Sequence, residues 1–233
     1  MNNNTRQQYL DAMGIDVWLP RDEVFGFNTV DEEQPSYIEG DSPQLGNDED
    51  LWQKLAAEVK HCQACSLCEQ RTNTVFGVGN RNADWLVIGE APGSEEDRQG
   101  EPFVGRAGKL LDQMFLALGL MREQVYIANV VKCRPPNNRD PRPEEMASCA
   151  DYLRRQIELT KPKIILLVGR VAAQSLLNTT DSVGKMRGVK YTYADTQIPM
   201  VVTYHPAYLL RSPLEKRKSW MDLQMAYRIY SQN

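Results

Sequence analysis

The sequence predicts an α/β fold, a three-layer sandwich in which helices cover both faces of a central four-stranded parallel sheet. Four short apolar runs, at 85–88, 125–131, 163–169 and 200–204, alternate with segments of helical periodicity. These runs are apolar at nearly every position, as strands buried on both faces are. Strand–helix alternation of this kind is typical of parallel sheets, so both observations predict the same architecture.

The expected helices lie around and between these runs. One apolar helical face is formed by Leu110, Leu111, Met114, Phe115 and Leu118. Further helices are expected from 143 to about 160 and over 171–177, and an earlier one begins the folded domain near residue 51.

Composition places the chain among ordinary globular proteins. Its 233 residues are 42% hydrophobic and 25% charged. No run approaches the roughly 18–20 apolar residues that a membrane-spanning helix needs. The first residues lack the basic and apolar regions of a secretory signal. We therefore expect no membrane association and a cytoplasmic location.

Charge divides the chain into two parts. Residues 1–50 hold 12 Asp and Glu against 2 Arg, whereas residues 51–233 hold 19 acidic and 25 basic residues. We predict an acidic, largely disordered leader at 1–50 and one folded domain at 51–233. A basic domain suits a phosphate-rich partner, although a solvated Lys and Arg surface would suffice for a charge this small.

A small apolar island interrupts the leader at 6–22, where Met13, Gly14, Ile15 and Trp18 stand out. An apolar island tethered by an acidic linker is a common form of docking peptide. The segment resembles the N-terminal peptide of the psi subunit of the bacterial clamp loader, which has a Leu-Gly-Ile-x-x-Trp core and docks on the chi subunit. The resemblance implies the chi subunit as a replisome partner. Packing of the peptide on the chain's own folded domain is the alternative.

The cysteines indicate a metal centre rather than disulfides, because the five of them are odd in number and unevenly spaced. Cys62 and Cys65 form a C-x-x-C pair that places two thiolates within reach of one metal centre. Further ligands must come from Cys68, Cys133 or Cys149, whose spacing disfavours a zinc ribbon. Spacing alone leaves an iron–sulfur cluster and a zinc ion open, with unligated thiols as a third interpretation.

A distinctive residue stands at the end of each expected strand: Glu90 after the first, Asn129 and Lys132 at the second, Arg170 after the third and His205 after the fourth. Open α/β sheets bind ligands beyond the carboxyl ends of their strands, so we expect a site there. His205, at a strand end and followed by a proline, is a candidate for chemistry.

Several ordered motifs between about residues 60 and 230 resemble the family 4 uracil-DNA glycosylases, the iron–sulfur branch of that superfamily. They are Cys62-x-x-Cys65, Arg71-Thr72 with Val75-Phe76-Gly77, Gly89-Glu90-Ala91-Pro92-Gly93 with Glu96-Asp97, Gly100-x-Pro102-Phe103-Val104-Gly105, Asn129-Val130-Val131-Lys132-Cys133-Arg134-Pro135-Pro136 with Asn138-Arg139, and His205-Pro206-Ala207-x-Leu209-Leu210-Arg211. The resemblance implies a uracil-DNA glycosylase-like fold. It also implies a monomeric, nucleoid-associated bacterial enzyme that hydrolyses the N-glycosidic bond of uracil in single- or double-stranded DNA during base excision repair.

The resemblance further implies a [4Fe–4S] cluster held by Cys62, Cys65, Cys133 and Cys149. In this family the cluster is structural and ties the N-terminal segment to the sheet. Cys68 falls where the family needs no ligand, so we expect it to be a spare thiol.

The resemblance assigns roles around an everted base. A glycosylase flips its target base out of the stack, and the departing uracil needs partners for its negative charge. By family correspondence, His205 faces uracil O2. The Asn129 amide offers an acceptor to N3–H and a donor to O4, which cytosine would mismatch. Phe103 supplies a stacking face.

The turn after the first strand adds a carboxylate and backbone donors. Backbone N–H groups of Gly89, Glu90 and Ala91 are expected to bind a uracil carbonyl oxygen. Glu90 and Glu96 are the candidates for orienting water or balancing the cationic sugar, and Glu90 is preferred.

DNA contacts are expected on both sides of the pocket. Leu209, Leu210 and Arg211 are predicted at the minor groove, with a leucine filling the gap left by the flipped base. Lys132 and Arg134 are predicted phosphate contacts, a solvated edge beside the cluster being the alternative.

Two further inferences concern the type of activity. One related branch of the superfamily traps its product covalently through a histidine in the loop after the Asn-bearing strand. The corresponding loop here, residues 134–140, has no histidine, so we predict that the enzyme releases its product and turns over. A non-catalytic DNA-binding or replisome-associated module is the rival hypothesis. That hypothesis predicts an eroded pocket, whereas Glu90, Phe103, Asn129 and His205 are all present.

Overall fold

The computed structural model describes residues 45–194 and 196–232. The predicted leader, with its docking peptide at 6–22, lies outside the described residues except for 45–50. Helix α2 spans Leu45–Lys60 and therefore runs across the predicted boundary at 51.

A mixed sheet forms the centre of the described residues. Its strands are β1 (Val78–Gly79), β2 (Trp85–Gly89), β3 (Val125–Asn129), β4 (Ile164–Val168), β5 (Lys190–Thr192) and β6 (Pro199–Thr203). Their order is β1-β3-β2-β4-β6-β5. The inner strands β3, β2, β4 and β6 are parallel, whereas β1 and β5 pair antiparallel with the two edges.

The predicted four-stranded parallel sheet is thus confirmed as the centre of a larger one. The four inner strands are buried at every position, which is why their sequences read as continuous apolar runs. The edge strands β1 and β5 were not predictable from the sequence because they are two and three residues long and have no buried position.

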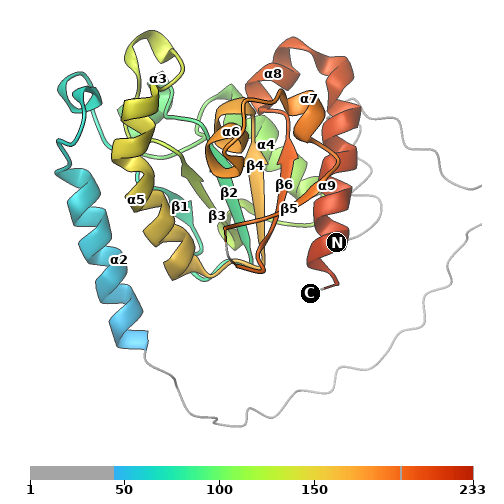
Figure 1. Ribbon diagram of the computed structural model, residues 1–233, viewed down its shortest axis with the longest axis horizontal. Helices are drawn as coiled ribbons and strands as arrows, with labels where there is room; N and C mark the ends of the chain where they lie inside the picture. Colours follow the sequence, from blue (N-terminus) through green and yellow to red (C-terminus); the bar gives the residue numbers. More distant parts are fainter. Residues whose placement is uncertain (1–44, 195, 233) are drawn as a thin grey trace, which may run out of the picture.

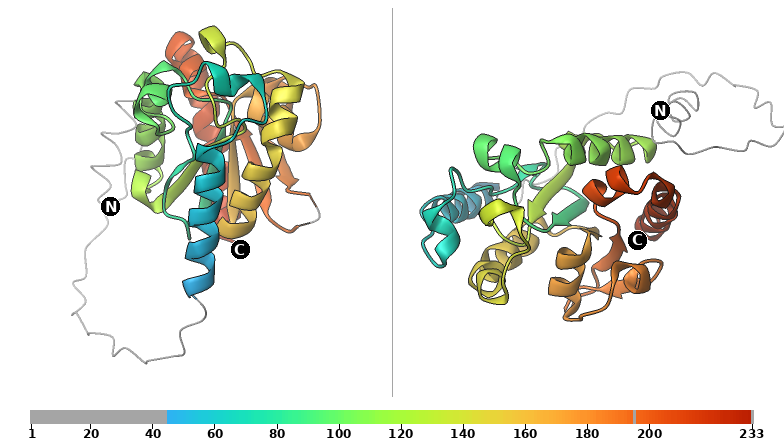
Figure 2. Two further views of the ribbon diagram at one scale, coloured as in Figure 1. Left: turned by 90° about the vertical axis from the view of Figure 1, so that its left-hand side faces the viewer. Right: turned by 90° about the horizontal axis from the view of Figure 1, so that it is seen from above.

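Helices cover both faces of the sheet, as Figures 1 and 2 show. One face carries α2, α5 (Pro143–Thr160), α6 (Arg170–Leu177) and α7 (Val183–Met186). The other carries α4 (Arg106–Ala117), α8 (Pro206–Arg211) and α9 (Lys216–Tyr230). Along β2, Leu86 and Ile88 join the first core while Trp85 and Val87 join the second, as the alternation of strand side chains requires.

The remaining elements are short. They are α3 (Ser94–Gln99) and the 3₁₀ helices η1 (Ser66–Glu69), η2 (Arg122–Gln124), η3 (Pro136–Asn138) and η4 (Pro213–Glu215). Among the described helices, none combines the length and apolar character that crossing a bilayer requires.

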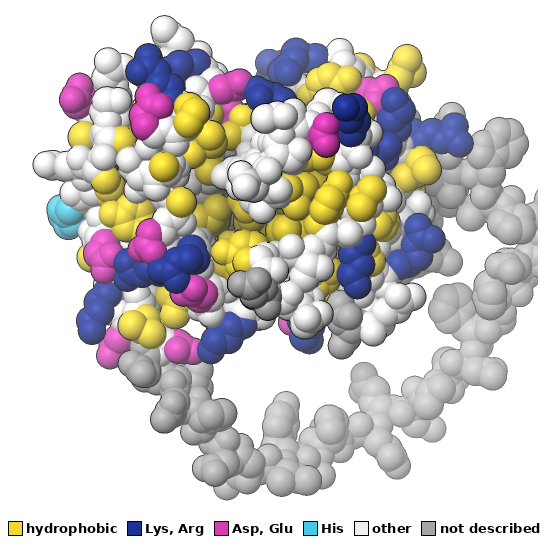
Figure 3. Space-filling view, in the orientation of Figure 1, with side chains coloured by type: hydrophobic (Ala, Val, Ile, Leu, Met, Phe, Trp, Pro, Cys, Tyr) yellow, Lys and Arg dark blue, Asp and Glu magenta, His cyan; other side chains and the backbone are white. Residues whose placement is uncertain are grey.

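The carboxyl ends of the four parallel strands meet at one edge of the sheet. Gly89 pairs with Asn129 in the register of β2 and β3, and Val168 pairs with Thr203 in that of β4 and β6. The loops that follow these strands therefore emerge side by side. In Figure 3, Lys and Arg side chains gather along the edge of the molecule where α3 and α8 lie.

Candidate active site

A cleft opens where the parallel strands end, with an empty volume of about 1700 Å³ that includes its open mouth. Glu90, Ala91, Phe103, Asn129 and His205 all line it. Five of the six predicted base-binding residues therefore share one cavity. The sixth, Gly89, lies directly beneath the side chains of Asn129 and Phe103.

Asn129 presents a buried amide to this cleft. It is the last residue of β3 and is 2% exposed. Its Oδ1 is buried and accepts no hydrogen bond within the described part of the chain. Buried polar atoms without a partner are rare in native proteins, and an Asn amide offers both an acceptor and donors. The side chain is thus available to a ligand that carries both kinds of group.

His205 presents a neutral imidazole. The pKa of His205 is lowered to about 4, chiefly by burial and also by the Arg211 cation, while Glu96 opposes the shift. Nδ1 accepts a hydrogen bond from the backbone N–H of Ala207 at 3.1 Å, which caps α8. Since Nδ1 is an acceptor, the ring proton lies on Nε2. His205 is therefore a neutral hydrogen-bond donor at physiological pH.

Phe103 forms a flat wall beside this imidazole. Its ring stacks on that of His205, with centroids 5.5 Å apart and an interplanar angle of 27°. Phe103 has a φ of +53°, a left-handed conformation that is uncommon for a bulky residue. Backbone strain of this kind persists only where the surroundings hold it in place, and it is frequent at binding sites.

Glu96 supplies part of that support. Its Oε1 accepts hydrogen bonds from the backbone N–H groups of Val104 and Gly105, both at 3.0 Å. The carboxylate that we considered for catalysis is thus bound to the loop that carries Phe103. This contact means that Glu96 holds that loop in place.

Glu90 is half-buried at the end of β2. The pKa of Glu90 is raised to about 7, chiefly by burial and also by the Asp140 carboxyl, while the Arg170 guanidinium opposes the shift. A carboxyl group with a pKa near 7 exchanges a proton readily at neutral pH, which is the property required of a general acid or base.

Two predicted DNA contacts are wrong in the structure. Lys132 is 1% exposed, and its Nζ donates to the backbone oxygen of Asn129 at 2.8 Å and to Oε1 of Gln156 at 2.6 Å. A cation enclosed in this way does not reach a phosphate. Leu209 is 1% exposed and packs in the core beneath α9, so it cannot enter DNA.

The other predicted DNA contacts lie at the surface. The Leu210 side chain is 43% exposed, and Arg211 is exposed and lines the cleft. Arg134 is half-buried, and its Nε donates to Oδ1 of Asn138 at 2.7 Å.

The site also contains residues that were not predicted from the sequence. Tyr204 and Tyr208 line the cleft on either side of His205, and Arg139 lines it after η3. The position of Tyr204 at the end of a strand was a usable signal. Asp140, whose charge acts on Glu90, carried no comparable signal because it lies in a polar loop far from any strand in sequence.

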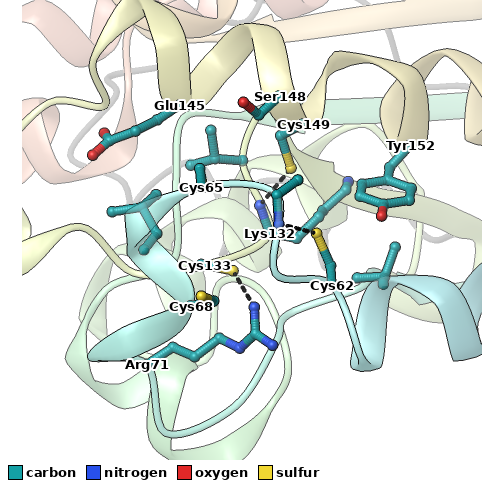
Figure 4. Close-up of a pocket in the computed structure, with 14 residues that line it drawn as sticks. Cys62, Cys65, Cys68, Arg71, Lys132, Cys133, Glu145, Ser148, Cys149 and Tyr152 are labelled. Atoms are coloured by element: carbon teal, nitrogen blue, oxygen red, sulfur yellow. Dashed lines mark hydrogen bonds between the residues drawn. The ribbon is translucent and has the colours of Figure 1, made fainter.

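A second cavity, with an empty volume of about 340 Å³, is lined by the five cysteines Cys62, Cys65, Cys68, Cys133 and Cys149 (Figure 4). Several donors point at the sulfur atoms. Arg71 Nη1 lies 3.1 Å from Sγ of Cys133, the Lys132 backbone nitrogen 3.3 Å from Sγ of Cys149 and the Ala64 nitrogen 3.5 Å from Sγ of Cys62. The structure thus brings the four predicted ligands together, with Cys68 beside them.

Within the described ranges, no group of three or more His, Cys, Asp or Glu side chains is placed to hold a single metal ion. A cubane cluster presents a separate iron to each thiolate, so its cysteines stand further apart than the ligands of one ion. Four cysteines around one cavity, with N–H donors to their sulfur atoms, fit such a cluster.

The cleft as a whole brings a buried amide, a neutral imidazole, an aromatic wall and a carboxyl group together at the carboxyl edge of the sheet, which makes it the candidate active site of an α/β enzyme. Comparison with known proteins leads to the same class. The family model described as the uracil DNA glycosylase superfamily matches residues 76–224.

Several relatives are similar along most of the chain. The type-4 uracil-DNA glycosylase of Archaeoglobus fulgidus is 47% identical over 165 residues, which cover 68% of this chain and 83% of the relative. That of Sulfurisphaera tokodaii is 47% identical over 171 residues, 70% and 78% of the two chains. That of Thermotoga maritima is 45% identical over 165 residues, 70% and 85% of the two chains. The chain belongs to the uracil DNA glycosylase superfamily, in its type-4 branch.

Proposed function

We propose that the protein hydrolyses the N-glycosidic bond of uracil in DNA, as a monofunctional glycosylase of base excision repair. One observation carries this proposal: Glu90, Phe103, Asn129 and His205 come from four separate segments and line one cleft. The relatives named type-4 uracil-DNA glycosylases support it, and the complete pocket argues against a purely non-catalytic DNA-binding module.

Each side chain has a task that its geometry suits. The flipped uracil stacks on Phe103, and the Asn129 amide reads N3–H and O4. His205 donates Nε2–H to O2 as negative charge develops there, and its neutrality means that no proton is transferred. Glu90 orients the attacking water or balances the cationic sugar. Backbone N–H groups of the turn at Ala91 complete the carbonyl contacts.

The test is a uracil-containing oligonucleotide followed by alkaline cleavage of abasic sites. Wild-type protein is expected to produce scission at uracil and none where cytosine or thymine replaces it. Asn129→Ala and His205→Ala each remove a contact to the leaving group, so each is expected to lower the rate by about 10²-fold or more. The other histidine, exposed His61, provides the matched control, and His61→Ala is expected to leave the rate unchanged. Equal rates for all four proteins would refute the proposal.

We also propose that Cys62, Cys65, Cys133 and Cys149 hold a [4Fe–4S] cluster. When bound, the cluster would join Cys62 and Cys65 in the loop after α2 to Cys133 after β3 and to Cys149 in the first half of α5. Wild-type protein and Cys68→Ser are expected to be brown, with broad absorbance near about 400 nm, whereas Cys149→Ser is expected to be colourless. Colourless wild-type protein with stoichiometric zinc, from anaerobic as well as aerobic preparations, would reject the cluster.

For the leader, we propose docking of residues 6–22 on the clamp-loader chi subunit, which would recruit a cytoplasmic, nucleoid-associated enzyme to the replisome. Residues 1–25 fused to an inert carrier are expected to retain the chi subunit, and the same fusion with Trp18→Ala is expected not to. Failure of the unmodified fusion would end this proposal. We further propose that the protein acts as a monomer, which light scattering of the full chain would test.

A further inference from the structure

An ion pair between Asp140 and Arg170 lies at the carboxyl edge of the sheet, where Arg170 and Glu90 line the same cleft. The Arg170 guanidinium donates to the Asp140 carboxylate. Arg170 is the first residue of α6, directly after β4, and Asp140 lies in the loop that follows β3 and η3. Because β2 lies between β3 and β4 in the sheet, the pair joins the two loops that flank the end of β2, where Glu90 stands.

Both partners are held from their outer sides. Arg139 binds the buried Glu145 carboxylate through two hydrogen bonds, at 2.8 and 2.6 Å, and donates to the backbone oxygen of Asp140 at 2.9 Å. On the other side, Arg170 Nη1 donates to Oε1 of Gln174 at 3.2 Å. The two charges are therefore oriented before a substrate arrives.

The Asp140–Arg170 ion pair adds little to the stability of the fold. The Arg170 and Asp140 side chains are 49% and 60% exposed, and exposed ion pairs contribute little to the free energy of folding. Their position is more informative, because a carboxylate and a guanidinium both act on the half-buried Glu90, and with opposite sign.

The other titratable groups that line the cleft near Glu90 are already compensated. Arg139 is paired with Glu145, and the Glu96 carboxylate accepts hydrogen bonds from two backbone N–H groups. His205 is neutral because burial keeps its pKa at about 4. Arg211 on α8 lines the same cleft, and its charge acts on His205. Within the described residues, Asp140 and Arg170 are the charged groups that face Glu90 most directly.

We propose that Asp140 and Arg170 are positioning residues for Glu90 that act on its carboxyl group with opposite electrostatic sign. This inference rests on the proposed uracil excision and deepens the role of Glu90 in it. Asp140 favours the protonated carboxyl and Arg170 favours the carboxylate. The two loops of the rim thus set the pH at which Glu90 becomes the anion that balances the sugar cation.

The test is the pH profile of single-turnover uracil excision. If excision needs the Glu90 carboxylate, the rate rises with pH as Glu90 loses its proton. This rise forms the acid limb of the profile, and Glu90→Gln is expected to abolish it. Asp140→Asn removes a like charge, so its acid limb is expected to move down by about 0.5–1 pH unit. Arg170→Gln removes an opposite charge, so its limb is expected to move up by a similar amount.

Opposite shifts are the decisive readout, because both substitutions break the same ion pair. A merely structural rim would make the two variants alike, with equal loss of rate and an unmoved limb, and that result would overturn the inference. Asp151→Asn and Arg154→Gln provide the matched control, since they break a similarly exposed pair on α5 and are expected to leave the limb unmoved.

A second measurement does not depend on activity. The carboxyl carbon of Glu90, labelled with ¹³C and assigned through Glu90→Gln, can be titrated by NMR in wild type and in both variants. Its midpoint is expected to move down in Asp140→Asn and up in Arg170→Gln. Inactive wild-type protein with these midpoint shifts would refute the proposed function alone, whereas unmoved midpoints would refute the role of the pair.

Discussion

Gly89 and Asn129 face each other in the register of β2 and β3 at a distance that leaves no room for a side chain on Gly89. A Cβ atom at position 89 would stand under 3.0 Å from Oδ1 of Asn129 and 2.6 Å from Cζ of Phe103. The glycine is required by this close approach. It allows the amide and the stacking ring to meet over the end of β2.

Gly89→Ala is therefore expected to displace Asn129 and Phe103 and to lower kcat/KM for uracil excision by about 10²-fold, the usual cost of a misplaced reacting geometry. Gly188→Ala is the matched control. Gly188 has a φ of +75° and no neighbouring atom within 4 Å of its added Cβ, so that variant is expected to lose about 1 kcal/mol of stability and no activity. Steady-state kinetics and urea denaturation separate the two effects. Full activity of Gly89→Ala would contradict the close-packing argument.

Lys132→Met is expected to destabilise the protein without altering its electrostatic contacts to DNA. The substitution leaves the Asn129 backbone oxygen and Gln156 Oε1 without their buried donor, which costs about 1–3 kcal/mol. Denaturation measures that loss, and the salt dependence of DNA affinity is expected to stay as in wild type. Arg211→Gln is expected to leave stability unchanged and to reduce the slope of log DNA affinity against log salt concentration by about one unit. A reduced slope for Lys132→Met would restore the sequence-based prediction.

The adjacent leucines 209 and 210 are expected to respond differently to truncation. Leu210→Ala removes the exposed side chain that we propose as the wedge, so excision from double-stranded DNA is expected to slow several-fold more than excision from a single strand, with an unchanged Tm. Leu209→Ala opens a cavity in the core under α9 and is expected to cost about 2–5 kcal/mol of stability. Parallel assays on the two DNA forms decide this. An equal effect of Leu210→Ala on both forms would exclude the wedge.

His205 makes stability depend on pH in a defined window. Its pKa is lowered from 6.5 to about 4, chiefly by burial, so the fold favours the neutral ring. The stability that this ring contributes is therefore complete above pH 6.5 and is lost as pH falls towards 4. The difference in unfolding free energy between wild type and His205→Gln is expected to shrink across that window, with His61→Gln as control. A difference independent of pH would show that the buried ring is not held neutral.

Individual strands and residues show which parts of the fold and of the site could be predicted from the sequence. The four parallel strands were predictable because each is buried on both faces and thus continuously apolar. Glu90, Asn129 and His205 followed from their places at strand ends, and the ordered motifs supplied the chemistry. The edge strands left no apolar signal. The burial of Lys132 depends on Gln156, 24 residues further on, and was not visible locally.

The sequence by itself determined the fold class and the set of residues at the carboxyl edge of the sheet, because continuous apolar runs specify the buried strands locally and helical periodicity specifies the helices. Only the tertiary structure decided which of these side chains face the cleft and which are enclosed. Glu96 holds the Phe103 loop, Lys132 is buried and Asp140 acts on Glu90 through contacts between distant segments. Burial and charge are properties of those contacts, so residue type alone does not fix them.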